Sequence, residues 1–188
     1  MSVQHTARTG KTYYLHDQTT AAGKRSYFFS MEPDGQLAAA IPDGYEVYEN
    51  ANGQVFLRKK AGQIILPEEV ALVEVALRKH GAPWQYRVEV KKNMITVHEA
   101  GDLSGLDRLA TEFGRGPLSA AEKVRHASFM AVMRFILVDK KTRTFVTERF
   151  CFRGSIDDWI PIGSPGTLLA QVHQFVKHLG RESIYELF

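Results

Sequence analysis

Short aromatic-rich runs alternate with polar, turn-forming segments in the first third of the chain, a pattern that predicts β-hairpins. Residues 13–16 and 26–31 are the first two such runs. Small and turn-forming residues lie between them, and Gly23 can adopt the positive φ angle that a tight turn needs. Residues 1–10 are polar, and we expect them to be frayed.

A second hairpin is predicted over residues 45–49 and 54–59. The connecting segment ends in Asn52-Gly53, and Asn-Gly between aromatic and β-branched runs is a strong hairpin signal. The two hairpins resemble each other in their aromatic strands and polar turns, but two copies without a common spacing do not define a repeat. We expect them to form an N-terminal unit of residues 1–61.

After Gly62 the hydrophobic pattern changes to that of a helix running from Pro67 to Gly81. Proline suits a first helical turn, the acidic pair that follows it suits the positive helix end, and glycine is a common stop. Apolar residues go most of the way around this helix, so it should be buried on several sides or lie in an interface. They are Val70, Leu72, Val73, Val75 and Leu77.

Residues 84–92 alternate cleanly between apolar and polar side chains, and residues 94–99 continue the strand pattern. A tight turn at Lys92-Asn93 would make the two segments a hairpin. The register that follows pairs Val90 with Ile95, Val88 with Val97 and Arg87 with His98. His98 would then lie exposed on the polar face of the sheet.

Two short helices are predicted next, each with a start signal. Ser104-x-x-Asp107 opens the first, and Ser119-x-x-Glu122 is a capping box for the second. Glycines at 114 and 116 end the first helix. Its apolar stripe consists of Leu103, Leu106, Ala110 and Phe113.

Residues 128–139 form an almost continuous apolar run, which predicts a central strand, and residues 144–154 form its antiparallel neighbour. A three-residue turn between them places Asp139 opposite Arg143 and, in the same register, Arg134 opposite Glu148. Two opposite-charge pairs fall into line together, which favours this register over a two-residue turn at Lys140-Lys141.

The last helix is predicted to begin with Ser164 as its cap and to end at Gly180. Asp157-Asp158-Trp159 before it is expected to be a loop. The apolar residues of the helix lie within about 120° of arc at ~100° per residue. They are Leu168, Leu169, Val172, Phe175, Val176 and Leu179.

Together these elements predict an α+β fold: an N-terminal pair of β-hairpins followed by a mainly antiparallel sheet packed with about four helices. The N-terminal unit (1–61) and a larger unit (62–188) are the expected division, with a single merged domain as the alternative.

Composition and charge narrow the class of protein only a little. The 188 residues are 44% hydrophobic and 24% charged, the balance of a globular chain. The net charge of +3 is evenly spread: residues 1–60 contain 7 Lys or Arg and 6 Asp or Glu, and the remainder contains 17 and 15. A nucleic-acid-binding protein usually concentrates its basic residues, so the charge alone does not favour DNA or RNA.

No metal or cofactor is expected. The one cysteine, Cys151, excludes an intramolecular disulfide and a cysteine-rich zinc site. His173 and His178 are five residues apart on one predicted helix and cannot share a metal ion as an i,i+4 pair would. The N-terminus lacks the apolar core of a secretory signal, and no apolar run is long enough to cross a membrane, so a cytoplasmic location without membrane contact is expected.

The predicted sheet carries two weak candidates for catalytic chemistry. Arg134 and Glu148 would be costly inside apolar strands unless paired, so they are either an anion or substrate site or, as we prefer, a structural ion pair. Cys151 lies two residues from Arg149, and a nearby guanidinium group favours the reactive thiolate. A cysteine nucleophile also needs a base, and none is close in sequence, so a small core residue is the favoured interpretation.

Aromatic and basic residues in the first hairpin form a candidate binding surface. In a nucleic-acid interpretation the aromatic rings stack on bases and the cations neutralise phosphates. In a protein-binding interpretation the same rings form a hot-spot patch. In the structural interpretation, which is favoured, they are core residues and cross-strand pairs. The candidate residues are Tyr13, Tyr14, Lys24, Arg25, Tyr27 and Phe29, with Lys140, Lys141 and Arg143 of the later turn.

These observations leave three hypotheses for function. The first is a non-catalytic binding protein that acts through a protein partner or self-association, since the sequence lacks a catalytic constellation and its helix 67–80 is apolar on several sides. The second is nucleic-acid binding through the aromatic and basic hairpins. The third is an enzyme with its site on the sheet around Arg134, Glu148 and Cys151, and the sequence does not decide whether the protein is an enzyme.

Overall fold

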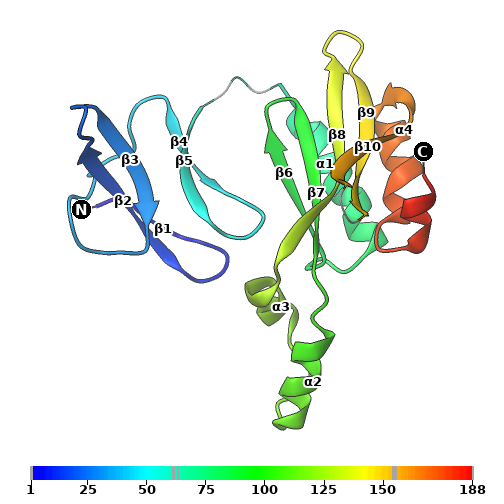
Figure 1. The fold of residues 1–188 in the computed structure, drawn as a ribbon, viewed down its shortest axis with the longest axis horizontal. Helices are drawn as coiled ribbons and strands as arrows, with labels where there is room; N and C mark the ends of the chain where they lie inside the picture. Colours follow the sequence, from blue (N-terminus) through cyan, green and yellow to red (C-terminus); the bar gives the residue numbers. More distant parts are fainter. Residues whose placement is uncertain (1, 61, 63, 154–155, 188) are drawn as a thin grey trace. The chain divides into compact units, whose positions relative to one another are not determined.

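A computed structural model describes residues 2–60, 62, 64–153 and 156–187 (Figure 1). Over these residues the fold is α+β, as predicted: small antiparallel sheets of three and two strands, then a five-stranded antiparallel sheet packed with helices. The chain divides into two compact units, which are described separately below. Unit 1 comprises residues 1–62 and 121–126, and unit 2 comprises residues 63–120 and 127–188.

Unit 1 is built from two small sheets. The three-stranded sheet has the order β1-β2-β3, and β4 and β5 form a separate hairpin. Gly23 adopts the positive φ angle that its turn was predicted to need, +74°, and Gly53 in the predicted second turn has a φ angle of +73°. The strands are β1 (Gln4–Thr6), β2 (Thr12–Thr19), β3 (Arg25–Ser30), β4 (Tyr45–Glu49) and β5 (Val55–Lys59).

The expected fraying of residues 1–10 is wrong, because Gln4–Thr6 form an antiparallel edge strand on β2. The partner strand supplies backbone hydrogen bonds that a polar segment can accept as readily as an apolar one. Ala7 continues the pairing through its N–H, which donates to the carbonyl oxygen of Lys11 over 2.8 Å. The polar composition of this segment therefore reflects an edge position and not disorder.

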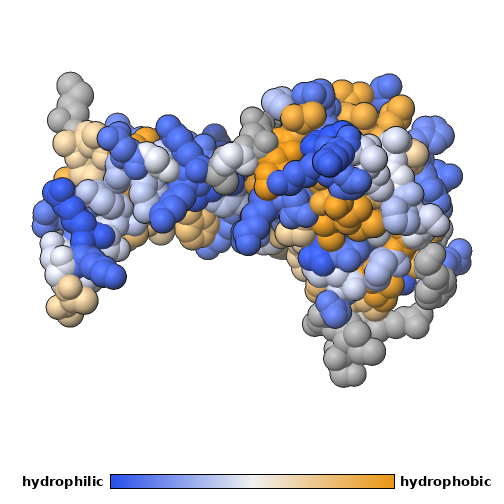
Figure 2. All heavy atoms as spheres, turned by 90° about the horizontal axis from the view of Figure 1, so that it is seen from above, coloured by the Kyte–Doolittle hydropathy of each residue, from blue (hydrophilic) through white to orange (hydrophobic). Residues whose placement is uncertain are grey.

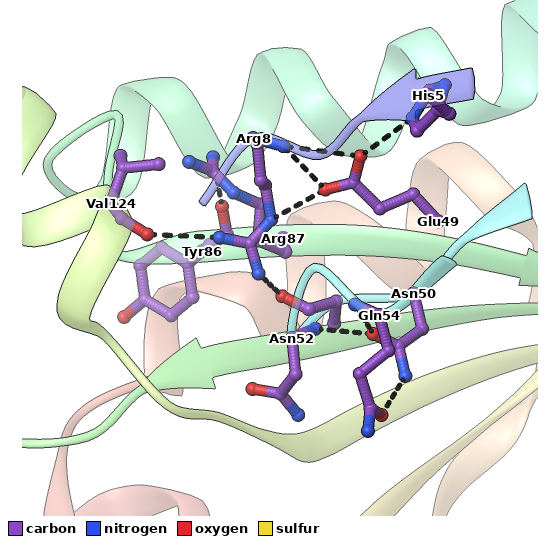
Figure 3. A network of polar contacts seen from close by, with 10 residues as sticks. His5, Arg8, Glu49, Asn50, Asn52, Gln54, Tyr86, Arg87 and Val124 are labelled. Atoms are coloured by element: carbon purple, nitrogen blue, oxygen red, sulfur yellow. Dashed lines mark hydrogen bonds and ion pairs between the residues drawn. The ribbon is translucent and has the colours of Figure 1, made fainter. Parts of the chain in front are cut away.

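Arg8 ties the elements of unit 1 together (Figure 3). Its guanidinium group donates to the carbonyl oxygens of Ala51 in the β4–β5 turn and, over 3.0 Å, of Val124 in α3 (Ala120–His126). Its Nε lies 3.5 Å from Oε1 of Glu49, and the other carboxylate oxygen, Oε2, lies 3.4 Å from Nε2 of His5. These charge-assisted contacts explain why a helix distant in sequence belongs to this unit.

Unit 2 is a five-stranded antiparallel sheet with the order β10-β9-β8-β7-β6. Helices α1 and α4 cover one face of this sheet (Figure 1). The strands are β6 (Tyr86–Lys91), β7 (Met94–Ala100), β8 (Phe129–Asp139), β9 (Thr144–Arg153) and β10 (Ile156–Thr167). The helices are α1 (Pro67–His80), α2 (Ser104–Glu112) and α4 (Leu168–Phe175), followed by the 3-10 turns η1 (Val176–His178) and η2 (Glu182–Glu186).

The core of unit 2 lies between the sheet and the two covering helices. Val73 and Leu77 of α1 and Phe175 of α4 pack against apolar residues of the central strands. The predicted end of α1 is confirmed, since the helix stops before Gly81. The β6–β7 register is also as predicted, with Arg87 opposite His98 and a left-handed Lys92 (φ +57°) in the turn.

The β8–β9 register is half as predicted. Arg134 does lie opposite Glu148, but Asp139 lies opposite Thr144 and not opposite Arg143. A register shift after Leu137 makes the turn longer than expected. The carboxylate of Asp139 accepts hydrogen bonds from the N–H groups of two following residues, 2.7 Å from Lys141 and 3.3 Å from Thr142. This side-chain turn replaces the cross-strand ion pair.

Strand β10 was not predicted from the sequence. Asp157, Asp158 and Trp159 lie in the strand and not in a loop, and Trp159 pairs with Phe150. Ser164 is not the helix cap, because the strand resumes its pairing after a bulge, and the cap is Thr167, whose Oγ1 accepts from the N–H of Ala170 over 3.3 Å. β10 is an edge strand, and an edge tolerates prolines such as Pro161 and Pro165.

Helix α4 buries most of its predicted apolar arc, and Gly180 ends the helical segment with a φ angle of +66°. Leu169 is the exception, since it is 65% exposed.

None of the helices that the structure describes has the length and the hydrophobicity that crossing a membrane would require.

Candidate functional site

The aromatic residues of the first hairpin divide between its two faces. Strand alternation puts Tyr13, Tyr27 and Phe29 on the same face as Leu15, which is fully buried. Tyr14 lies on the opposite face, and all four aromatic side chains are half-buried. This arrangement resembles a small core more closely than an open stacking platform.

The basic residues of the same hypothesis also fall into different settings. Lys24 is exposed, whereas Arg25 forms an ion pair with Asp17 over 2.9 Å. In unit 2, Lys140 and Lys141 are exposed. Arg143 instead pairs with the carboxylate of Glu69 on α1 and donates to the carbonyl oxygen of Ile64. Two of the five candidate cations therefore already have anionic partners.

Arg134 and Glu148 form the expected ion pair, with Nε and a carboxylate oxygen 2.5 Å apart. Trp159 of β10 completes the group, because the guanidinium carbon lies 4.2 Å from the centre of its indole ring. The indole in turn meets Phe150 edge-on at 5.2 Å. A cation held by both a carboxylate and an aromatic face is stabilised without any ligand.

Arg149 and Cys151 lie on the opposite face of β9 from Glu148, because successive side chains alternate. The guanidinium group of Arg149 is buried and donates to the carbonyl oxygens of Tyr185 and Leu187 near the C-terminus. Cys151 is buried as well. The four candidates for catalysis thus do not converge on one site, and among the described residues no group of three metal-binding side chains was found.

His98 was expected to be exposed, but its side chain is only 13% exposed. It lies across the polar face from Glu89, with Nε2 and a carboxylate oxygen 3.7 Å apart. Burial lowers the pKa of His98, and the nearby negative charge of Glu89 opposes that shift. The expectation did not include the register shift between β7 and β8 next to His98.

An apolar groove of about 620 Å³ lies between α1 and the α4–η1 segment of unit 2. We call it the α1–α4 groove. Its apolar lining residues come from both sides, and Val75 and Leu169 are 43% and 65% exposed. The apolar lining consists of Ala71, Leu72, Val75 and Ala76 of α1 and Leu169, Val172 and Val176 of α4–η1.

The composition of α1 explains the α1–α4 groove. Val73 and Leu77 face the sheet and fill the core, while Val75 lies on another side of the helix. Two small residues, Ala71 and Ala76, leave space beside it. The sequence indicated one wall of this groove, because α1 was predicted to be apolar on several sides. The opposite wall depends on the exposure of Leu169, which the sequence did not indicate.

Positive and titratable groups surround the α1–α4 groove. Lys79 and Lys177 are exposed at its edge, together with His173. His80 also lines it, with Nε2 2.8 Å from the carbonyl oxygen of Leu179. Among the described residues that line the groove, none carries a carboxylate. An apolar surface with a cationic rim suits a hydrophobic segment that carries acidic residues.

On the face drawn in Figure 2, unit 2, which contains the α1–α4 groove, has more hydrophobic surface than unit 1. Strongly hydrophobic residues gather in patches on the visible face of unit 2, whereas the visible face of unit 1 carries mostly polar residues (Figure 2).

Three comparisons, with protein-family models, with curated proteins and with solved structures, each gave no match. The α1–α4 groove must therefore be interpreted from its own chemistry.

Proposed function

We propose that this protein is a non-catalytic binding protein that holds a segment of a polypeptide in the α1–α4 groove. The observation that carries the proposal is an exposed apolar groove between two helices that the core itself does not fill. Its volume of about 620 Å³ falls in the range of ligand-binding clefts, roughly 300–1,000 Å³. The protein would act in the cytoplasm, where its single thiol can stay reduced.

The shape and charge of the α1–α4 groove favour an amphipathic helix as its occupant. A groove between two helices accepts the apolar side of a third helix through side chains at positions i, i+3, i+4 and i+7. Lys79 and Lys177 at the rim favour acidic residues beside that apolar side. The expected partner segment is therefore a short, acidic, amphipathic helix.

The first test uses two designed, fluorescently labelled helical peptides with the same leucine stripe. One carries glutamate beside the stripe and the other carries lysine. Fluorescence anisotropy should show that the acidic peptide binds the full chain more tightly than the basic one, and that added salt weakens the acidic peptide's binding.

The matched variants are Leu169→Glu in the groove and Val138→Glu on β8, another exposed apolar residue of unit 2. Leu169→Glu should raise the dissociation constant for the acidic peptide at least about tenfold, a loss of roughly 1.4 kcal/mol, because it places a charge against apolar side chains. Val138→Glu should leave binding unchanged. Equal binding by both variants, or no binding of either peptide, would overturn the proposed function.

A further inference from the structure

Helix α2 presents an apolar stripe that nothing in the described structure covers. The helix has no buried residues, and the exposed fractions of Leu106, Leu109 and Phe113 are 42%, 47% and 81%. A helix of nine residues is too short to be stable in water without packing, since isolated helices below roughly 12–15 residues are marginal. Within the described structure, α2 is therefore an amphipathic helix whose apolar side has no surface to pack against.

The charges of α2 complement the rim of the α1–α4 groove. The apolar stripe that α2 presents consists of Leu106, Leu109, Ala110 and Phe113. At about 100° per residue, Asp107 lies about 60° from Ala110 on one side of this stripe, and Glu112 lies about 60° from Leu109 on the other. Arg108 lies further from the stripe, and its guanidinium group is 4.0 Å from the carboxylate of Glu112. The stripe therefore has acidic flanks, and the groove has lysines at its edge.

The two surfaces do not meet within one chain. α2 and the α1–α4 groove both belong to unit 2, and α2 stands apart from α1 and α4 at the end of the connection that follows β7 (Figure 1). Each chain thus presents the apolar stripe of α2 and the α1–α4 groove, and both are exposed to solvent.

We propose that α2 of one copy lies in the α1–α4 groove of a second copy, so that two chains exchange α2 in a symmetric dimer. This inference rests on the proposed function, and it names the segment that the groove holds. Reciprocal exchange closes the assembly and leaves neither surface exposed. It also doubles the contact area, which matters because one short helix buries less than the ~1,200 Å² of a stable interface. Phe113 is the aromatic anchor.

The test is sedimentation velocity of the full chain over a range of concentrations, with one variant on each surface. Leu109→Glu disables α2 and Leu169→Glu disables the groove. The wild type should dimerise reversibly, and each variant should raise the dimer dissociation constant at least about tenfold. An equimolar mixture of the two variants should associate more strongly than either alone, because only the mixed pair retains one intact contact.

Val138→Glu is the control and should dimerise like the wild type, and far-ultraviolet circular dichroism checks that every variant is folded. A wild type that stays monomeric at the highest concentration that remains in solution would overturn the exchange of α2. So would a dimer that Leu109→Glu leaves intact, or a mixture that gains nothing. The peptide experiment above distinguishes these failures, since a groove that binds the acidic peptide without dimerising keeps the proposed function and loses only this inference.

Discussion

At the scale of single residues, the charged side chains of the sheet are explained by their partners. Arg134 has the carboxylate of Glu148 on one side and the indole of Trp159 on the other. Arg143, which was expected to face Asp139, reaches α1 and pairs with Glu69. The Arg134–Glu148 pair follows from the register of β8 and β9 and could be predicted. Partners from distant segments, such as Trp159 and Glu69, could not.

Removing one member of the Arg134–Glu148 pair should destabilise the fold. The side chains are 23% and 17% exposed, so Arg134→Met leaves a largely desolvated carboxylate without its cation. We expect the free energy of unfolding to fall by about 1–3 kcal/mol. Urea denaturation of Arg134→Met, Glu148→Met and the double variant measures the coupling. The double variant should lose less than the sum of the two single losses, and simple additivity would contradict a coupled pair.

His98 should make the stability of the protein depend on pH. Burial lowers its pKa in the folded chain, whereas the unfolded chain has the ordinary value of about 6.5. Below that value the unfolded state binds more protons than the folded state, so the free energy of unfolding falls as the pH falls, by at most about 1.4 kcal/mol per pH unit. Above about pH 7 the two states bind equally and the contribution is constant.

The measurement is urea denaturation of the wild type and His98→Gln between pH 5 and pH 8. The wild type should lose stability relative to His98→Gln as the pH falls below about 6.5, and the difference should be independent of pH above 7. A constant difference over the whole range would show that His98 is not desolvated in the folded protein.

At the scale of elements, local sequence patterns predicted the β6–β7 hairpin correctly but misplaced the start of α4. The β6–β7 hairpin follows from its alternation and from a left-handed turn at Lys92, both of which are local. The start of α4 was placed too early, because Ser164-Pro165 has the chemistry of a helix cap. In the structure these residues belong to β10, which pairs with β9. That pairing depends on a strand further back in the sequence, which a local pattern does not include.

Gly163 is the residue that makes this arrangement feasible. Its φ angle is +67°, and a Cβ atom there would lie 2.5 Å from Cζ of Phe175 in the core. Gly163→Ala should therefore lower the free energy of unfolding by about 2–4 kcal/mol, from a left-handed backbone and a clash together. Gly116→Ala is the control, since Gly116 has a similar φ angle of +72° with open space around it, and should cost about 1–2 kcal/mol. Equal losses in thermal or urea denaturation would mean that Phe175 does not constrain this turn.

At the scale of the whole molecule, the fold class follows from the order of the elements, and the functional surface does not. Hairpins followed by mixed strands and helices predicted the α+β architecture. The sequence also predicted that the helix at 67–80 is apolar on more sides than one sheet face would cover. Which of those sides stays exposed depends on how α1 and α4 divide the face of one sheet, and that is a property of packing. Leu106 and Phe113 of the apolar stripe of α2 were predicted, but their exposure was not. The predicted member Leu103 is buried, and the exposed Leu109 was not among the predicted residues.

Photo-crosslinking from the α1–α4 groove tests the central claim most directly. The photoreactive amino acid p-benzoylphenylalanine replaces Leu169 in the full chain, and Val138 in a control chain. After irradiation of the purified protein, mass spectrometry identifies the crosslinked peptides. We predict a crosslink from position 169 to residues 104–113 of a second copy, and none to that segment from position 138. A crosslink from position 169 to a different polypeptide segment would keep the groove as a binding site and reject the exchange of α2. The absence of any crosslink from position 169 to a second copy would contradict the exchange of α2, and the peptide experiment would then decide whether the groove binds a helix at all.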